Sequence, residues 1–156
     1  LRIYLGMIMQ LLNKIVLVGL LAVSLQGCQL GSDDEETVIE ATDITRSVSD
    51  TVETINRTDL YRFIVTGDSN FFELEDDIDE IVVTGDNNVI TIIEDSALAA
   101  LTISGSDNTI KLETGLSTRI DNILIGGEGN TVIITEYLTA LDNGTGTSLT
   151  GTKVTL

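Results

Sequence analysis

The sequence predicts an all-β protein, a parallel β-solenoid of about four to five coils, from a repeated pattern, its spacing and its alternation. Four segments fit Φ-x-Φ-x-G-x-x-N-x-Φ-x-Φ, where Φ is apolar: residues 63–74 (FIVTGDSNFFEL), 81–92 (IVVTGDNNVITI), 101–112 (LTISGSDNTIKL) and 123–134 (ILIGGEGNTVII). Their glycines are 18, 20 and 22 residues apart, a period typical of stacked solenoid repeats: Gly67, Gly85, Gly105 and Gly127. The alternating apolar positions indicate strands with one buried face.

The pattern also gives each side chain a direction. The Φ positions, rich in β-branched residues, are expected to face a shared core. They are Phe63, Val65, Phe72, Leu74, Ile81, Val83, Ile90, Ile92, Leu101, Ile103, Ile110, Leu112, Ile123, Ile125, Val132 and Ile134. The residues between them, such as Thr91, are expected to face outward.

The G-x-x-N interval fits a corner between two strands of one coil, where glycine can supply a positive φ. Stacked coils would place the asparagines about 4.8 Å apart. Because an amide both donates and accepts, these residues are predicted to form a hydrogen-bonded ladder: Asn70, Asn88, Asn108 and Asn130.

The N-terminal flank, residues 37–60, lacks this signature and is predicted to be a cap. Its apolar residues recur at steps of four, four and three, which indicates a capping helix with Asp43 as N-cap: Ile44, Val48, Val52 and Ile55. The many Thr, Ser and β-branched residues favour the alternative, an irregular first solenoid turn.

The C-terminal flank, residues 148–156, is similar to a degenerate fifth copy around Gly151, reached through a flexible approach at Gly144 and Gly146. We therefore assign residues 61–156 to the solenoid domain.

Residues 1–27 are predicted to be a lipoprotein signal peptide. Lys14 precedes an apolar run at residues 15–23 (IVLVGLLAV), which has signal-peptide length and is shorter than the roughly 20 residues of a spanning helix. Translation is expected to begin at Met7 or Met9, which places residues 1–6 upstream of the start.

Residues 25–28 (LQGC) resemble the bacterial lipobox, in which a cysteine is diacylated and becomes the new N-terminus. The resemblance implies that Cys28 is lipidated and anchors the chain to the membrane. Gln29, in place of Asp, implies the outer membrane if the host has two membranes. Residues 28–36 would then be a lipidated acidic tether.

Composition excludes several functions. The formal net charge of −17 repels nucleic acid and anionic lipid. The chain has no His, which excludes His-based catalysis, and Cys28 as the only cysteine excludes an internal disulfide or a cysteine metal cluster.

Four acidic residues lie between the glycines and asparagines, where stacking would gather them at one edge: Asp68, Asp86, Asp107 and Glu128. Such carboxylates could hold a hard cation such as Ca²⁺, or could simply extend into water. We expect the solvated state, hence no cofactor and no metal site.

A carbohydrate-active enzyme of the polysaccharide lyase or hydrolase class is the alternative function. Only Lys111 and Arg119 lie inside the repeats as candidate bases, and residues 73–80 and 94–95 could supply paired acids. No motif frames them, so we expect no catalysis.

The outward positions of the first strands form a column with three aliphatic residues, Ile64, Val82 and Leu124, which Phe71 and Val89 would extend around the corner. An exposed apolar column is often a partner surface, here for an envelope protein or a glycan. A loop folded over the column is the other interpretation.

The G-[DSE]-x-N-x-Φ-x-Φ units resemble DUF3060, a family of small secreted β-solenoid domains of bacterial lipoproteins, over about residues 63–134. The resemblance implies a right-handed parallel β-helix on a lipid anchor, with no assigned activity. Residues 126–133 (GGEGNTVI) are similar to the calcium-binding RTX nonapeptide, but Thr131 stands where the ligating Asp belongs. We therefore expect an envelope lipoprotein with a structural or binding solenoid.

Overall fold

The computed structural model describes residues 39–96 and 98–155. They form eleven strands and, within these ranges, no helix. The strands are β1 (Thr42–Arg46), β2 (Val52–Ile55), β3 (Tyr61–Val65), β4 (Phe71–Leu74), β5 (Ile78–Val83), β6 (Val89–Ile92), β7 (Leu98–Ile103), β8 (Thr109–Leu112), β9 (Arg119–Ile125), β10 (Thr131–Asp142) and β11 (Ser148–Lys153).

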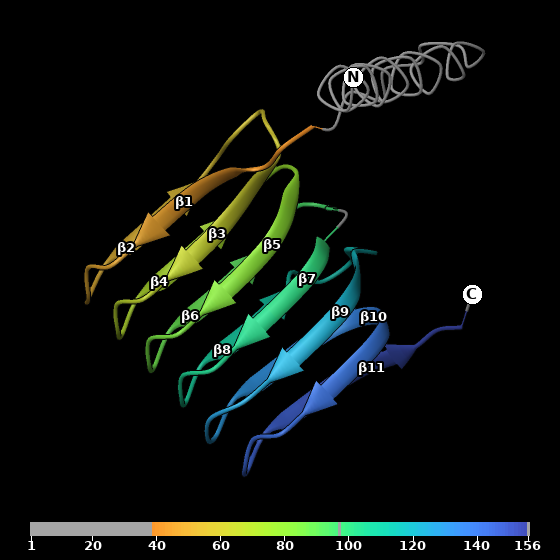
Figure 1. Cartoon of the computed structure of the whole chain (residues 1–156). Coiled ribbons are helices and arrows are strands. Elements are labelled where there is room, and N and C mark those ends of the chain that lie inside the picture. The colour runs from red at the N-terminus through yellow and green to blue at the C-terminus, as the bar shows by residue number, and fades with distance from the viewer. Residues whose placement is uncertain (1–38, 97, 156) are drawn as a thin grey trace, which may run out of the picture. The chain divides into compact units, whose positions relative to one another are not determined.

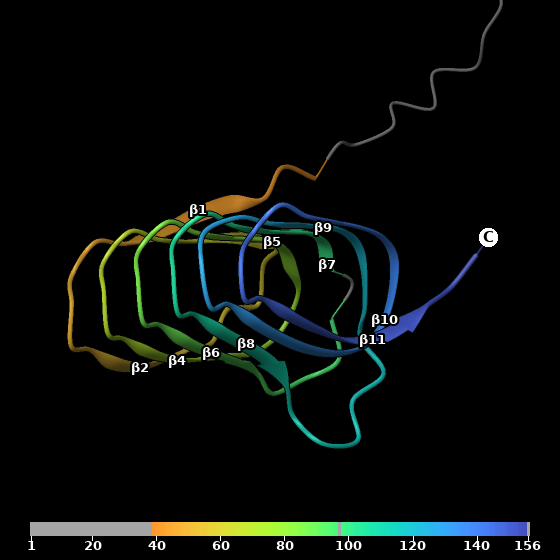
Figure 2. The same cartoon turned by 90° about the horizontal axis from the view of Figure 1, so that it is seen from below.

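The strands stack as a parallel β-solenoid, which confirms the predicted fold class (Figure 1). The odd-numbered strands β1 to β9 and the end of β10 form one side, the first face. The even-numbered strands β2 to β8, the start of β10 and β11 form the second face. About six turns are present instead of four to five, because both flanks of the repeat array complete a turn (Figure 2).

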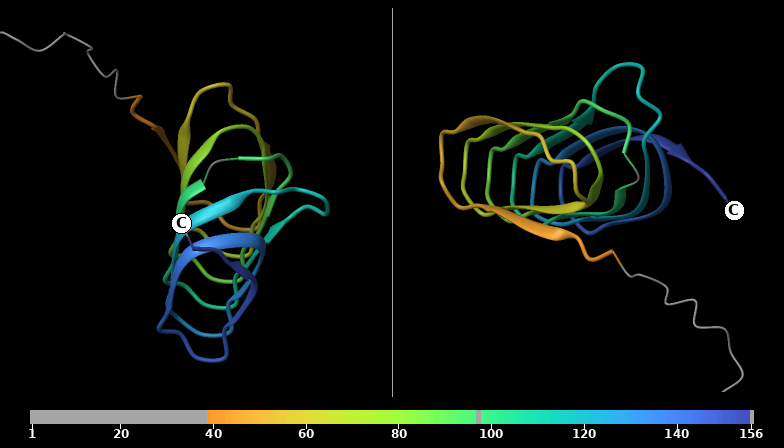
Figure 3. Two further views of the ribbon diagram at one scale, coloured as in Figure 1. Left: turned by 90° about the vertical axis from the view of Figure 1, so that its right-hand side faces the viewer. Right: turned by 90° about the horizontal axis from the view of Figure 1, so that it is seen from above.

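Each turn has two corners. The Asn corner joins the first face to the second and comprises residues 48–51, 67–70, 85–88, 105–108, 127–130 and 144–147, matched by the strand register. The loop corner leads from the second face to the next turn, at residues 56–60, 75–77, 93–96 and 113–118. The loop at 113–118 projects from the stack, whereas β10 runs through its own corner without a break (Figure 3).

The core lies between the two faces. Fifteen of the sixteen Φ residues are buried, and Leu112 is partly buried against the same cluster. Phe63 and Phe72 meet edge to face, with ring centroids 5.1 Å apart. Full burial of one such side chain stabilises the fold by about 1.5–3 kcal/mol, so the several buried side chains of each turn stabilise its packing against the neighbouring turns.

The expected capping helix at residues 37–60 is wrong: the described part of this segment contains β1 and β2, which pair with β3 and β4 as the first solenoid turn. Ile44 and Ile55 are buried, whereas Val48 and Val52 are 55 % and 81 % exposed. The helical spacing arose because a corner interrupts two short strands, and the β-branched residues follow their strand preference.

An ion pair closes the N-terminal end of the core. Arg46 and Glu53 stand in register with the buried Val65 and Phe72. Arg46 Nε donates to Glu53 Oε2 at 2.7 Å, and Arg46 Nη2 donates to Glu53 Oε1 at 2.6 Å. A bidentate charged pair at this position discourages another strand from stacking on the open edge.

The last turn also differs in detail from the prediction. Gly144 and Gly146 form its Asn corner, and Gly151 lies within β11. Gly146 has a φ of 64°, like the equivalent residues of earlier turns.

Candidate functional site

The four asparagines form a continuous ladder along the Asn corners. They are at most 2 % exposed. The Nδ2 atoms of Asn70, Asn88 and Asn108 each donate to the Oδ1 of the next asparagine, at 2.9, 3.1 and 3.2 Å in chain order. The Oδ1 atoms of Asn88, Asn108 and Asn130 also accept the backbone N–H of the preceding asparagine, at 2.9–3.0 Å. These amides bind turn to turn and so fix the register of the stack.

The signature glycines are required by close approach of the backbone. A Cβ at Gly67, Gly85, Gly105 or Gly127 would lie closer than 3.0 Å to a carbonyl oxygen of the preceding turn. The same carbonyls accept the Nδ2 atoms of the asparagines, at 2.8–3.0 Å. A methyl group there would therefore push the turns apart and break the ladder.

The expected positive φ occurs at Gly127 but not at the other three signature glycines. It belongs instead to the third corner residue of every turn, with φ of 56–65°: Asp50, Ser69, Asn87, Asp107, Gly129 and Gly146. Ser, Asn and Asp tolerate this conformation better than most residues, which explains why the position need not be glycine.

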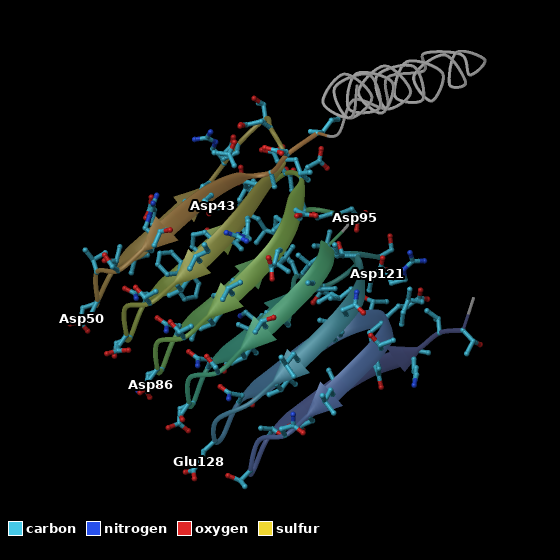
Figure 4. All side chains as sticks on the ribbon, viewed as in Figure 1. Asp43, Asp50, Asp86, Asp95, Asp121 and Glu128 are labelled. Atoms are coloured by element: carbon cyan, nitrogen blue, oxygen red, sulfur yellow. The ribbon has the colours of Figure 1, made fainter. Side chains whose placement is uncertain are left out.

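A second ladder of oxygen acceptors runs beside the asparagines. In the first four turns, the side chain of the second corner residue accepts the backbone N–H of its equivalent in the next turn, at 2.7–3.3 Å: Ser49, Asp68, Asp86 and Ser106. Asp68 and Asp86 thus share one column with Glu128, while Asp107 lies in the neighbouring one. The corner side chains form a row at one edge of the solenoid (Figure 4).

These carboxylates do not form a preassembled metal centre. Within the described ranges, no three His, Cys, Asp or Glu side chains group as metal ligands would. Asp68 and Asp86 already use Oδ1 to accept a backbone N–H. Calcium binding at this edge therefore stays a hypothesis.

The aliphatic residues of the first face lie in register. Ile64 and Val82 are half-buried and Leu124 is 41 % exposed; Leu141 of β10 continues the row at 57 %. We call Ile64, Val82, Thr102, Leu124 and Leu141 the apolar column. A shallow hollow of about 270 Å³ borders its C-terminal half. Phe71 and Val89 lie on the second face and form a separate row.

The second face holds a different feature, which we call the groove. It encloses about 300 Å³ and is lined by Phe71, Glu73, Thr91, Lys111, Glu113 and Thr114, with two aliphatic neighbours. Glu73, Thr91 and Lys111 are consecutive in one outward column. Thr91, expected to be an outer residue, is only 7 % exposed, and its Oγ1 has no hydrogen-bond partner among the described residues.

The candidate catalytic residues are dispersed. Arg119 pairs with Asp121 at 2.9 Å on β9, whereas Lys111 forms no ion pair with any described residue. Asp95 Oδ1 accepts the backbone N–H of Ser117 at 2.7 Å. Of the candidate acids, only Glu73 shares the groove with Lys111.

Cys28, the signal peptide and the tether lie outside the described residues. Among the residues that are described, no helix has the length and hydropathy needed to cross a membrane.

Sequence reasoning missed the acceptor ladder, the Arg46–Glu53 pair and the groove. The break in the Φ-x-Φ pattern at Arg46 and Glu53 was a usable signal, since charged residues there replace apolar ones. No sequence signal marked the groove, because residues of three turns and two loop corners form it.

Residues 65–123 match the family model DUF3060, described as a protein of unknown function. No curated protein and no solved structure matches the chain.

Proposed function

We propose that this chain, whose residues 65–123 are a match to DUF3060, is a lipid-anchored envelope protein with a non-enzymatic β-solenoid binding module. Two sequence features support the proposed lipid anchor: the apolar run at 15–23 and the lipobox-like sequence at 25–28. The acidic segment at 30–36 would hold the solenoid away from the membrane surface. In a host with two membranes, Gln29 favours the outer one.

The apolar column is the observation that carries the binding role. It contains no charged residue, although the chain has a net charge of −17. Leu124 and Leu141 expose large aliphatic surface beside a shallow hollow. Contiguous exposed apolar surface of this kind typically marks a protein–protein contact. The partner is therefore an envelope protein with a complementary apolar surface, and nucleic acid is disfavoured by charge.

The absence of catalysis is part of the proposal. Asp68, Asp86 and Asp95 already accept backbone N–H groups, and Arg119 is paired with Asp121. Groups committed to such contacts are poorly placed for proton transfer to a substrate.

The anchor is tested with Cys28→Ser, which removes the acylated thiol and leaves every described residue unchanged. We expect the wild type to pellet with the membranes after a high-salt wash and the variant to stay in the supernatant. A variant that still pellets would exclude the lipid anchor.

The binding face is tested by placing a photo-crosslinking residue at Leu124 and, as a matched control, at Thr150 on the second face. Irradiated cells should give a discrete adduct from position 124 that is absent from position 150. Equal adducts from both positions, or none from 124, would exclude the apolar column as the partner surface.

A further inference from the structure

The groove on the second face is a candidate ligand site that is independent of the apolar column. Its volume of about 300 Å³ is at the lower end of the range for small-molecule pockets. One wall comes from Glu113 and Thr114 of the projecting loop (Figure 3). Loops held by a rigid scaffold are where binding residues most often lie.

The charged groups of the groove are mixed in sign, and none of them is ion-paired with a described residue, although Glu73 Oε2 accepts a hydrogen bond from Thr54 Oγ1 at 3.3 Å. Glu73, Thr91 and Lys111 follow one another in register, which places the Cα atoms of Glu73 and Lys111 roughly 10 Å apart. No carboxylate among the described residues lies within ion-pair distance of Lys111. By contrast, all four described arginines are ion-paired.

Thr91 gives the second, independent indication of a ligand. Thr91 is a lining residue of the groove, and its Oγ1 is buried without a hydrogen-bond partner among the described residues. Buried hydroxyls are normally satisfied. The neighbours of Thr91 in the column, Glu73 and Lys111, are long side chains that can move apart, so a polar ligand atom entering between them would supply the missing partner.

The groove also has an apolar part. Phe71 is half-buried at one side, in register with Val89. Aromatic rings offer a flat apolar surface against which the C–H face of a pyranose can pack.

We infer that the groove binds an uncharged saccharide. The carboxylates of Glu73 and Glu113 can accept hydrogen bonds from sugar hydroxyls, the Lys111 ammonium can donate to them, and Phe71 can contact the apolar sugar face. Two carboxylates and one ammonium leave the groove negative within a chain of net charge −17, which disfavours anionic glycans. A purely apolar ligand would leave all three charges desolvated.

The test uses the purified full chain in detergent on a printed panel of uncharged hexose and N-acetylhexosamine oligosaccharides, with uronate oligosaccharides of equal length. We expect retention of uncharged members only. Titration calorimetry with a retained oligosaccharide should then show binding at least tenfold weaker for Lys111→Gln, and within twofold of wild type for Lys153→Gln, a lysine of β11 outside the groove.

Thr91→Val separates binding from folding. It removes a hydroxyl that has no hydrogen-bond partner among the described residues, so the melting temperature should be unchanged or higher, while saccharide affinity falls at least fivefold. The inference is overturned if no uncharged saccharide is retained, if uronates alone are retained, or if Lys111→Gln and Thr91→Val both bind like the wild type. None of these outcomes bears on the apolar column, which is tested by crosslinking.

Discussion

The two corners of each turn are built on different principles. The Asn corner has four residues in every turn, and its side chains and carbonyls bond to the adjacent turns. The loop corner varies in length, from residues 75–77 at its shortest to residues 113–118 at its longest. In β10 the chain passes this corner as a continuous strand, without a loop. A change in the length of the Asn corner would break the amide ladder on both sides. The loop corner is also bonded between turns, because Ser96 Oγ accepts the Ile78 N–H and Thr118 Oγ1 accepts the Ser96 N–H. Its length nevertheless varies around these bonds, and it supplies one wall of the groove.

The Asn corner of the first turn has neither signature residue. Val48 and Thr51 occupy the glycine and asparagine positions. The Arg46–Glu53 pair links the two strands on either side of this corner. Charge thus replaces part of the amide ladder in the first turn of the described stack.

The largest expected effect is that of Gly85→Ala. The added Cβ would overlap the Gly67 carbonyl, which Asn88 also uses, so we expect a loss of about 3 kcal/mol or more. Gly115→Ala in the loop corner meets no atom within 4 Å and should cost only about 1 kcal/mol, through its φ of 98°. Urea denaturation of both variants measures the difference. Equal losses would show that the two corners are equally permissive.

Asn88→Ala should have the next largest effect, a loss of about 2 kcal/mol. It leaves the backbone N–H of Asn70 and the carbonyl of Gly67 without their side-chain partner, and each buried unpaired group costs about 1–3 kcal/mol. The matched control is Asn122→Ala, an asparagine of β9 whose hydrogen bonds, to Ala99 O and from Thr139 Oγ1, are solvent-exposed, so its loss should change stability by less than about 0.5 kcal/mol. Equal unfolding midpoints for the two variants would contradict a structural role for the ladder.

Removing the Arg46–Glu53 pair with Glu53→Gln should lower the free energy of unfolding by a smaller amount, which depends on pH. The hydrogen bond from Arg46, opposed by burial, holds the pKa of Glu53 below its ordinary value. Its stabilising contribution is therefore complete above the ordinary glutamate pKa and is lost as the pH falls through the lowered one. The stability difference between wild type and Glu53→Gln should shrink between about pH 6 and pH 3.

The control for this titration is Glu94→Gln, at an exposed residue of the loop corner that forms no ion pair with the described residues. Its stability curve should run parallel to that of the wild type. A Glu53→Gln curve that also stays parallel would show that the first corner does not depend on the charge pair.

The repeat pattern was sufficient to predict the core and the column of asparagines, but not the other contacts between turns. Alternation placed fifteen of sixteen residues inside because period two is a property of each strand alone. The reason for Gly85, by contrast, is a carbonyl of the preceding turn, and the burial of Thr91 depends on long side chains from adjacent turns. Close approaches and burial of this kind depend on how the turns stack and on the lengths of their loops, which the repeat pattern does not specify. The spacing of Ile44, Val48 and Val52 misled because a corner between short strands can imitate a helical period.

The smallest expected effect concerns calcium at the Asn corner. Asp68 and Asp86 carry one column of carboxylates, but each already accepts a backbone N–H, and Asp107 lies in the next column. We therefore expect millimolar calcium to raise the melting temperature no more than sodium chloride of equal ionic strength, since any salt screens a net charge of −17. Asp86→Asn keeps an oxygen acceptor for Ser106 N–H and should behave like the wild type in both salts. A calcium-specific rise that Asp86→Asn abolishes would contradict this, because a ligand that binds only the folded state stabilises it by RT ln(1 + [L]/Kd). The Asn corner would then bind a ligand as well as hold the stack, and the division of roles between the two corners would be wrong.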